Sequence, residues 1–316
     1  MYMTMAAISV VIPTFNAVGQ VESLLTRLHH FHGKYADCCQ VIIADDCSGD
    51  GTPMEIRKSY PWVDVVENRQ NRGFGANVMT GVAVARHPYL AVLNSDIELV
   101  GNPFKGLIEA LEQNAILFAT MPLVFNRNLN KVENLARLYC HRGLCWHTEL
   151  PEEDEWSSVL RNLLNTAVDT KSRLRDLGGK VRPIRSVLCG ALFVCRREEF
   201  LAVGGFDSRY APFYWEDVDL DYRARRHSRY CAVIPSCAVI HRHSETIDRY
   251  HFKRKLLYLR LNQLRFVIEH QKELMKSAGL RGQHIWWGAR ALKECFGGHA
   301  ALRLAYLKAG IGMKNV

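Results

Sequence analysis

Acidic side chains are concentrated in one short stretch, residues 215–221, where WEDVDLD holds four carboxylates in seven positions. In a helix, Asp217 and Asp221 would share one face and repel each other. Such clustering is tolerated where one acid is protonated or where the acids meet a cation. The stretch therefore predicts a general base whose pKa is raised by its neighbours, or else an acid-rich helix N-terminus that the helix dipole stabilises.

Two more sets of polar residues follow apolar runs. Asp45 and Asp46 come after QVIIA, and Asn94, Ser95 and Asp96 come after YLAVL. A carboxylate that leaves a buried strand can accept hydrogen bonds from a nucleobase or a ribose, and it suits Mg²⁺ or Mn²⁺ bridging two phosphates. The alternatives are helix capping and turn chemistry at the first set, and a plain strand exit at the second.

His241 begins a His–x–His pattern after the apolar run 231–240. Histidine is the commonest metal ligand in proteins, so the pattern could mark a metal site. It could equally be the polar end of a strand, and the residues alone leave both interpretations open.

The elements that would position these residues alternate along the chain. Apolar runs predict strands at 8–12, 40–44, 63–67, 89–93, 187–195 and 231–240, and amphipathic spacing predicts helices at 18–31, 53–59 and 73–86. Such alternation indicates an α/β fold with a mostly parallel sheet that is covered by helices on both faces. Ligands bind at the carboxyl ends of the strands in these sheets, which is where Asp45 and Asp96 lie.

Two regions depart from this pattern. Residues 127–183, which include the acidic run PEEDEW, are expected to form an irregular insertion. Residues 249–316 predict a basic helical extension, with helices near 249–276, 285–296 and 300–307, and they carry 14 Lys and Arg against three Asp and Glu. We therefore expect one α/β domain over 1–248, followed by an extension that could face an acidic surface.

Bulk composition narrows the class of protein. With 316 residues, 48% of them hydrophobic and 23% charged, the chain has the composition of a globular protein with a full-sized core. No apolar run reaches the roughly 20 residues of a transmembrane helix, and the first residues lack the basic segment of a signal peptide. The ten cysteines include no CxxC pair, so we expect reduced thiols rather than a zinc ribbon.

Six ordered blocks together resemble the family 2 glycosyltransferases of the GT-A fold, and among them the bacterial rhamnosyltransferase-like branch. The blocks lie within roughly residues 8–270 and are VVIPTFN, ADDCSGDGT, NRGFGANVMTG, LNSDIEL, CGALFVCRREEFLAVGGFD and FYWEDVDLDYRARR. Each block is weak alone, whereas all six in this order are specific. The resemblance implies a GT-A (Rossmann-like) catalytic domain over 1–248, with 127–183 on the acceptor side.

The resemblance also implies a role for each polar residue. Asp217 would be the catalytic base, and Asp96 and His241 would contact the metal, while Asp45 would read the imide of the nucleobase. The full set of implied substrate-binding residues is Pro13, Thr14, Asn16, Asp45, Arg72, Gly73, Asn94, Ser95 and Glu216. Asn94 stands where the family's metal-binding DxD motif has its first Asp, which weakens the implied metal affinity.

In activity, the resemblance implies a metal-dependent, inverting glycosyltransferase with Mg²⁺ or Mn²⁺ as its cofactor. It would move a sugar from a nucleoside diphosphate sugar, dTDP-rhamnose or a UDP-sugar, to a glycan or polyprenyl-linked acceptor. The product would be a cell-surface polysaccharide such as O-antigen. The expected location is the cytoplasm, at the inner face of the cytoplasmic membrane.

The basic extension leaves other hypotheses open. Its aromatic residues, among them Trp286, Trp287 and Phe296, could make a peripheral membrane contact beside Lys and Arg. The same helices could instead pack on the catalytic domain or on a second copy in a homodimer. A nucleic-acid-binding module would interleave aromatic and basic residues along a groove. These aromatics fall on apolar helix faces, so no nucleic-acid partner is expected, and a non-catalytic nucleotide-binding scaffold is the remaining alternative.

Overall fold

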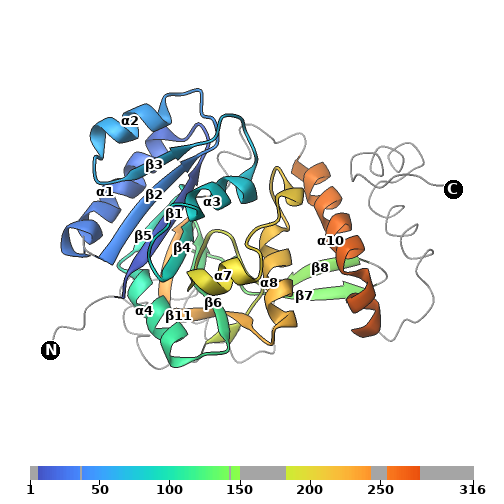
Figure 1. The fold of residues 1–316 in the computed structure, drawn as a ribbon. Coiled ribbons are helices and arrows are strands. Elements are labelled where there is room, and N and C mark those ends of the chain that lie inside the picture. The colour runs from blue at the N-terminus through green and yellow to red at the C-terminus, as the bar shows by residue number, and fades with distance from the viewer. Residues whose placement is uncertain (1–5, 36–37, 142–143, 150–182, 243–254, 278–316) are drawn as a thin grey trace.

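The computed structural model describes residues 6–35, 38–141, 144–149, 183–242 and 255–277. Its centre is a nine-stranded sheet in the order β3-β2-β1-β4-β10-β6-β11-β5, with β9 paired to β11, and β7 and β8 form a separate hairpin (Figure 1). The strands are β1 Ile8–Thr14, β2 Cys39–Asp45, β3 Asp64–Glu67, β4 Tyr89–Leu93, β5 Ile97–Val100, β6 Leu117–Asn126, β7 Ala136–His141, β8 Leu144–Glu149, β9 Ile184–Arg185, β10 Leu192–Arg196 and β11 Tyr230–His241.

Most strands of the large sheet run in one direction. β3, β2, β1 and β4 are mutually parallel, and the register places Val11 opposite both Ile42 and Val92. β10 is antiparallel to β4 and β6, while β6 and β11 are parallel to each other. The carboxyl ends of β1, β2, β4, β6 and β11 therefore lie at the same edge of the sheet. The prediction of a mostly parallel α/β sheet is confirmed, with β10, β5 and β9 running in the opposite direction.

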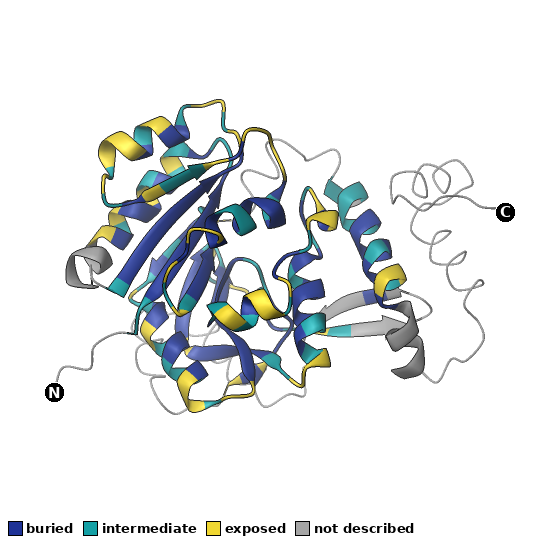
Figure 2. Ribbon diagram, viewed as in Figure 1, coloured by how far each residue is buried: buried dark blue, intermediate teal, exposed yellow. Residues whose placement is uncertain are grey.

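Helices cover both faces of the sheet. They are α1 Val18–Tyr35, α2 Thr52–Ser59, α3 Phe74–Val82, α4 Pro103–Gln113, α7 Arg197–Ala202, α8 Glu216–Arg226 and α10 Lys255–Ser277, with a short 3₁₀ turn, η2, at Ser208–Tyr210. Val10 and Ile12 of β1 pack in the cluster that contains α1, α2 and α4, whereas Val11 packs in the cluster with α3, α7 and α8. This division follows from the alternation of side chains along a strand. Figure 2 shows the strands of the sheet buried between these two layers.

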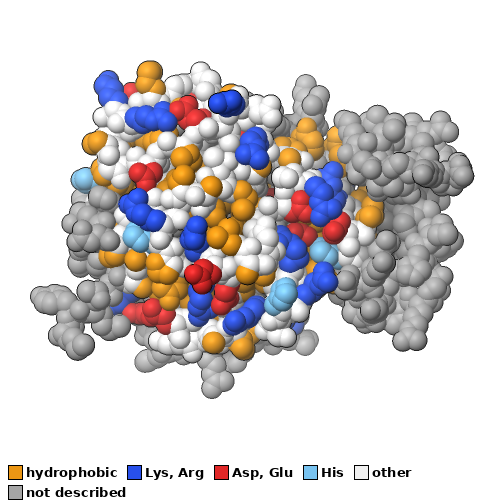
Figure 3. Space-filling model, in the orientation of Figure 1, with side chains coloured by type: hydrophobic (Ala, Val, Ile, Leu, Met, Phe, Trp, Pro, Cys, Tyr) orange, Lys and Arg blue, Asp and Glu red, His pale blue; other side chains and the backbone are white. Residues whose placement is uncertain are grey.

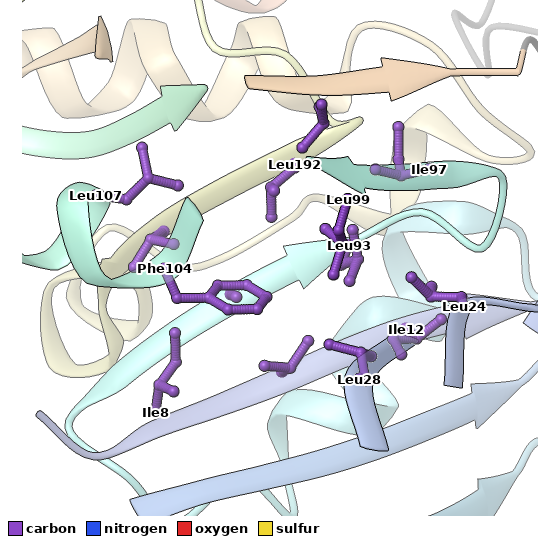
Figure 4. Close-up of a cluster of buried hydrophobic side chains, with 14 of the residues drawn as sticks. Ile8, Ile12, Leu24, Leu28, Leu93, Ile97, Leu99, Phe104, Leu107 and Leu192 are labelled. Carbon is purple, nitrogen blue, oxygen red and sulfur yellow. The ribbon is translucent and has the colours of Figure 1, made fainter. Parts of the chain in front are cut away.

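Close packing fixes the helices against the strands that carry polar ends. On one face, Leu24 and Leu28 of α1 and Phe104 of α4 are at most 2% exposed and belong to one buried cluster with Ile8 and Ile12 of β1 (Figure 4). On the other face, a Cβ on Gly81 of α3 would lie 2.5 Å from Cγ1 of Val11. Only a residue without a side chain allows α3 this close to the sheet. The N-terminus of α3 is thereby held beside the carboxyl ends of β1 and β2.

α10 packs directly on the body that contains the sheet. Its Phe266 ring lies 5.2 Å from the ring of Trp215, just before α8, and its Gln263 amide donates a 2.6 Å hydrogen bond to the carbonyl of Cys145 on β8. In Figure 1, α10 lies beside α8 and the β7–β8 hairpin. The first helix predicted for the basic extension thus belongs to the same packed unit. The predicted helices near 285–296 and 300–307 lie outside the described residues.

Several predicted elements differ from the structure. The strands near 8–12, 40–44, 63–67, 89–93 and 231–240 are confirmed with small changes at their ends, whereas the strand predicted at 187–195 begins only at Leu192. The region 127–183 is not irregular throughout, because it contains the β7–β8 hairpin. β5, α4 and β6 had no counterpart in the predicted elements. Among the described cysteines Cys145 forms a disulfide, so the expectation of reduced thiols is wrong for this residue.

Two surface properties bear on the predicted partners. No helix in the described ranges is both long enough and apolar enough to cross a membrane. On the face shown in Figure 3, Lys and Arg side chains are interspersed with Asp and Glu over the described surface, so this face presents no uniformly basic area.

Candidate active site

A cavity of about 270 Å³ lies at the carboxyl ends of β1 and β4. These are the last two strands of the parallel part of the sheet, before the antiparallel strand β10. Residues from both halves of the chain meet in its lining because parallel strands end at one edge of a sheet. The lining residues to which the resemblance assigns a role are Pro13, Thr14, Gly73, Asn94, Ser95, Asp96, Glu216, Asp217 and His241.

The carboxylate of Asp217 is held by backbone N–H groups. The N–H of Gly190, in the loop before β10, donates to Oδ2 at 3.0 Å, and the N–H of Val218 donates to Oδ1 at 2.8 Å. Asp217 also lies in the first turn of α8, where the helix dipole favours negative charge. These contacts fix the direction of an acceptor oxygen at the wall of the cavity.

Glu216, the neighbour of Asp217, lines the same cavity but has a different environment. It is 6% exposed, and its Oε2 has no hydrogen-bond partner among the described residues. Burial raises the pKa of Glu216 well above its ordinary value, and the negative charge of Asp217 raises it further. Glu216 therefore favours its neutral form, in which it adds no second charge beside Asp217 and can donate a hydrogen bond to a ligand.

The loop that precedes α8 forms another wall of the cavity, through Pro212, Phe213 and Tyr214. The carbonyl of Pro212 accepts a 2.7 Å hydrogen bond from the N–H of Phe74, at the start of α3. Gly73 has a φ of 82°, and a Cβ at this position would lie 2.7 Å from the carbonyl oxygen of Pro212. The NRGFGAN block and the FYWED block are therefore in contact, and Gly73 is required for that contact.

Asp96 and His241 face each other across the strand ends. Nε2 of His241 lies 3.3 Å from Oδ2 of Asp96, and Nδ1 lies 3.3 Å from Oε2 of Glu133. Burial lowers the pKa of His241, but hydrogen bonds and the negative charges of Asp96 and Glu133 outweigh it and raise the pKa to about 9. Nearby, Oδ1 of Asn94 is a buried acceptor with no hydrogen-bond partner among the described residues.

Asp45 and Asp46 differ in their hydrogen-bond partners and in their position relative to the cavity. Asp45 is completely buried, and its carboxylate accepts hydrogen bonds from the hydroxyls of Thr14 and Ser48, at 3.0 and 2.5 Å, and from the N–H of Ser48 at 2.8 Å. Asp46 lines the cavity, and it accepts 2.8 Å hydrogen bonds from the N–H groups of Arg72 and Gly73. Burial raises the pKa of Asp46, against the opposing effect of these hydrogen bonds.

Three predicted residues lie outside the lining of the cavity. Asp45 is completely buried and bonds to Thr14 and Ser48, Asn16 accepts a hydrogen bond from the N–H of Gly49 at 2.8 Å, and the Arg72 guanidinium lies 3.4 Å from the hydroxyl of Thr80. Asn16 and Arg72 nevertheless belong to loops that reach the cavity through Thr14 and Gly73. Asp46 had been considered only together with Asp45, and Asn71, Phe74 and Asn77 belong to the NRGFGAN block, which the resemblance assigns to the donor diphosphate and sugar. The lining residues that the prediction missed are Phe15, Cys189, Gly190, Ala191, Pro212, Phe213 and Tyr214. All of these except Pro212 lie within the six blocks, so position inside a motif was the available signal.

Residues 9–172 match the model of the family described as glycosyl transferase family 2. A relative from Mycobacterium tuberculosis, an N-acetylglucosaminyl-diphospho-decaprenol L-rhamnosyltransferase, is 27% identical over 228 residues, which are 66% of this chain and 68% of the relative. An undecaprenyl-phosphate 4-deoxy-4-formamido-L-arabinose transferase from Aeromonas hydrophila is 30% identical over 62% of this chain and 54% of its own length.

Solved structures share the fold. The structure of GalNAc-T7 with UDP, GalNAc and Mn²⁺ matches with a TM-score of 0.57 at 18% identity, over 84% of this chain. This chain spans about half of that one, 48% of its length. A mannosyltransferase from Pyrobaculum calidifontis, in complex with GDP-Man and Mn²⁺, matches with a TM-score of 0.53 at 15% identity, over 98% of this chain and 81% of the other.

The sequence match extends from β1 past the Asp96 turn, and the same segment supplies most of the strand ends at the cavity. Its arrangement, a mixed sheet flanked by helices, is shared with the solved GT-A glycosyltransferases. The chain therefore belongs to glycosyl transferase family 2 and has the GT-A fold.

Proposed function

We propose that the protein transfers a sugar, with inversion, from a nucleoside diphosphate sugar to a hydroxyl of a lipid-linked or glycan acceptor. The observation that carries this proposal is the shared cavity, in which the fixed carboxylate of Asp217 lies with Asp96 and His241 at the carboxyl ends of the strands. A base on one wall and a cation-binding pair on another are the two groups that such a displacement requires.

Asp217 is proposed as the general base. Its carboxylate would take the proton of the acceptor hydroxyl as that oxygen attacks C1 of the donor sugar, and the nucleoside diphosphate would leave from the opposite face. This in-line displacement inverts the anomeric centre. The hydrogen bond from Gly190 and the position at the start of α8 support the role, because they hold the carboxyl group of Asp217 in one direction.

The donor would occupy the part of the cavity formed by the N-terminal strands. We propose that Pro13, Thr14, Asn16 and Asp45 hold the nucleoside, directly or by shaping the loops around it. Further residues would contact the diphosphate and sugar, namely Arg72, Gly73, Asn94, Ser95 and Glu216. The M. tuberculosis relative is named for an L-rhamnosyl transfer, which supports dTDP-rhamnose as the first donor to test, with UDP-sugars next.

We propose that Asp96 and His241 hold a divalent cation, Mg²⁺ or Mn²⁺. One carboxylate oxygen and one imidazole nitrogen 3.3 Å apart suit two neighbouring positions of an octahedral shell, provided that the cation displaces the proton that raises the pKa of His241 to about 9. The described residues contain no group of three or more such side chains arranged as a metal site, so the diphosphate and water would complete the shell. The unpartnered Oδ1 of Asn94 supports a hydrated cation beside it. When bound, the cation would neutralise charge on the departing diphosphate.

The acceptor is proposed to be linked to a polyprenyl carrier. Two relatives are named for transfers involving decaprenol and undecaprenyl phosphate, and this supports a lipid-linked acceptor and work at the inner face of the cytoplasmic membrane. We propose that the region 127–183 contributes to the acceptor side and that residues 249–316 add the peripheral membrane contact. Most of both regions lies outside the described residues.

The test uses the full-length protein in a thermal-shift screen with dTDP, UDP and GDP and their sugars, each with Mn²⁺ and with EDTA. A ligand at 100 times its Kd should add about 2.7 kcal/mol of stability. Wild type and Asp217→Asn should both shift with the same nucleoside diphosphate, and only the wild type should turn the donor over. Product NMR should show the opposite anomeric configuration to the donor. No shift with any nucleotide, or normal turnover by Asp217→Asn, would contradict the proposal.

A further inference from the structure

The loop before α8 is held by its backbone carbonyls. The carbonyl of Pro212 accepts a hydrogen bond from the N–H of Phe74, at the start of α3. The carbonyl oxygens of Tyr210, Phe213 and Tyr214 lie 2.6, 3.0 and 3.0 Å from the side-chain amide nitrogen of Asn262 on α10, and they share its two N–H groups. One residue 45 positions after Asp217 in the chain thus gathers three carbonyls of the loop that leads into it.

The orientation of this amide is fixed as well. Oδ1 of Asn262 accepts a 2.7 Å hydrogen bond from the guanidinium of Arg265, so the amide nitrogen must face the loop. Arg265 also donates to the carbonyl of Arg209, at the other end of the same loop. Asn262 is 1% exposed, so water cannot replace its hydrogen bonds. The amide therefore presents its N–H groups to the loop carbonyls, which can only accept hydrogen bonds.

The loop needs such support because its backbone is unfavourable. Tyr214 and Trp215 have φ values of 77° and 76°, in the left-handed region that bulky residues rarely adopt. A conformation of this kind persists only where the surroundings impose it. Glu216 and Asp217 follow directly, so the direction in which α8 starts depends on these two residues keeping their conformation.

We propose that Asn262 is a positioning residue for the transfer reaction. Through the three carbonyls it holds the loop 210–215 in the conformation that places Asp217 at the cavity and keeps Phe213 and Tyr214 in its wall. The inference rests on the proposed function, since it assigns Asp217 as the base. Asn262 does not line the cavity, so it acts on the reaction only through the loop.

The chain offers a matched control in the next residue. Gln263 is equally buried, at 2% exposure, and its amide also donates to a backbone carbonyl, but that carbonyl belongs to Cys145 on the β7–β8 hairpin. Gln263→Ala therefore removes a buried amide from the same turn of α10 without touching the loop. Asn262→Asp is the second variant, because it keeps the shape and places an oxygen where three carbonyls need a donor.

The experiment compares wild type, Asn262→Ala, Asn262→Asp and Gln263→Ala in the full chain, at a temperature well below the lowest Tm. A displacement of about 1 Å at a catalytic group can cost about 100-fold in rate. We expect kcat to fall on that scale in both Asn262 variants while the Kd of the nucleoside diphosphate stays unchanged. Gln263→Ala should lower Tm comparably and keep kcat near the wild-type value.

Hydrogen exchange of the peptide that covers residues 209–217 gives a readout that does not need turnover. Exchange there should accelerate in both Asn262 variants and stay unchanged in Gln263→Ala. If Asn262→Ala or Asn262→Asp keeps the wild-type kcat, or if Gln263→Ala loses as much, the positioning role is refuted. If the wild type itself turns over no nucleotide sugar, the proposed function fails instead. In that case, hydrogen exchange still tests the role of Asn262: an unchanged exchange rate of residues 209–217 in both Asn262 variants would refute the claim that Asn262 holds the loop.

Discussion

Asp219 lies two residues after Asp217 and could be mistaken for the base, but changing it to asparagine should affect stability rather than chemistry. It is 1% exposed and does not line the cavity. Its Oδ1 lies 2.7 Å from Nε2 of His270 and accepts a 3.2 Å hydrogen bond from the hydroxyl of Tyr210, and its Oδ2 accepts a 2.7 Å hydrogen bond from Arg223. Both oxygens therefore accept hydrogen bonds within the protein, and those of Oδ1 join α8 to α10 and η2.

The size of the effect follows from these contacts. An asparagine has one acceptor oxygen, so its amino group must face either Arg223 or the pair formed by His270 and Tyr210. In either orientation the ionised acceptor opposite Arg223 is lost, so a charge-assisted hydrogen bond is lost or weakened, which costs roughly 1.5–3 kcal/mol. At about 2 °C per kcal/mol for a protein of this size, Tm should fall by about 3–6 °C.

The assay measures Tm and turnover per folded molecule for Asp219→Asn and Asp217→Asn side by side. The two variants should show opposite patterns, because Asp219→Asn loses stability and keeps most turnover, whereas Asp217→Asn keeps stability and loses turnover. An Asp219→Asn protein with the wild-type Tm and no turnover would refute this reasoning and make Asp219 the base. The comparison must be made below the Tm of both variants.

Three further predictions follow from the site. In Glu216→Gln, the Tm of the variant minus the Tm of the wild type should increase as pH rises from 4 to 8. The folded-state pKa of Glu216 is raised, so the contribution of Glu216 to wild-type stability is lost as pH rises through that pKa, whereas glutamine cannot ionise. A difference in Tm that is constant with pH would contradict it. In Asp96→Ala, Mn²⁺ should no longer tighten nucleoside diphosphate binding; a wild-type response in titrations with and without EDTA would remove Asp96 from the metal site. In Gly73→Ala, Tm should fall, because the φ of 82° and the contact with Pro212 cost on the order of 1–3 kcal/mol; Gly19→Ala, whose Cβ would meet nothing within 4 Å, is the control.

The strands and the polar residues that follow them were predictable because both are local. β1, β2, β4 and β11 are apolar runs that end where polar residues begin, and a chain cannot bury such residues inside a sheet at low cost. The placement of Asp96 at the cavity followed from the general rule for strand ends, whereas the placement of Asp217, in the first turn of α8, followed only from the family resemblance. β6 was missed although all but one of its residues are buried, and its run contains Pro122, a residue that is disfavoured in the interior of a sheet.

The residues of the lining that were missed are those whose position depends on other parts of the chain. Gly190 becomes important because its N–H meets the carboxylate of Asp217, 27 residues later. Asp46 was one of two adjacent acids, and the sequence could not tell which would face the cavity. The structure separates them by partners, since Asp45 bonds to Thr14 and Ser48 while Asp46 bonds to the loop beside the cavity.

By itself, the sequence determined the class of fold, the positions along the chain of the strands that carry polar ends, and the family through six ordered blocks. These properties depend on side-chain periodicity and on residues that are neighbours in the chain. Only the tertiary structure decided that Asp219 is hydrogen-bonded to His270 and Arg223, that Asn262 bonds to the loop before α8, and that α10 packs against the residues around α8. Hydrogen bonds between residues tens of positions apart depend on how the helices dock, and docking is set by packing, which no local pattern records.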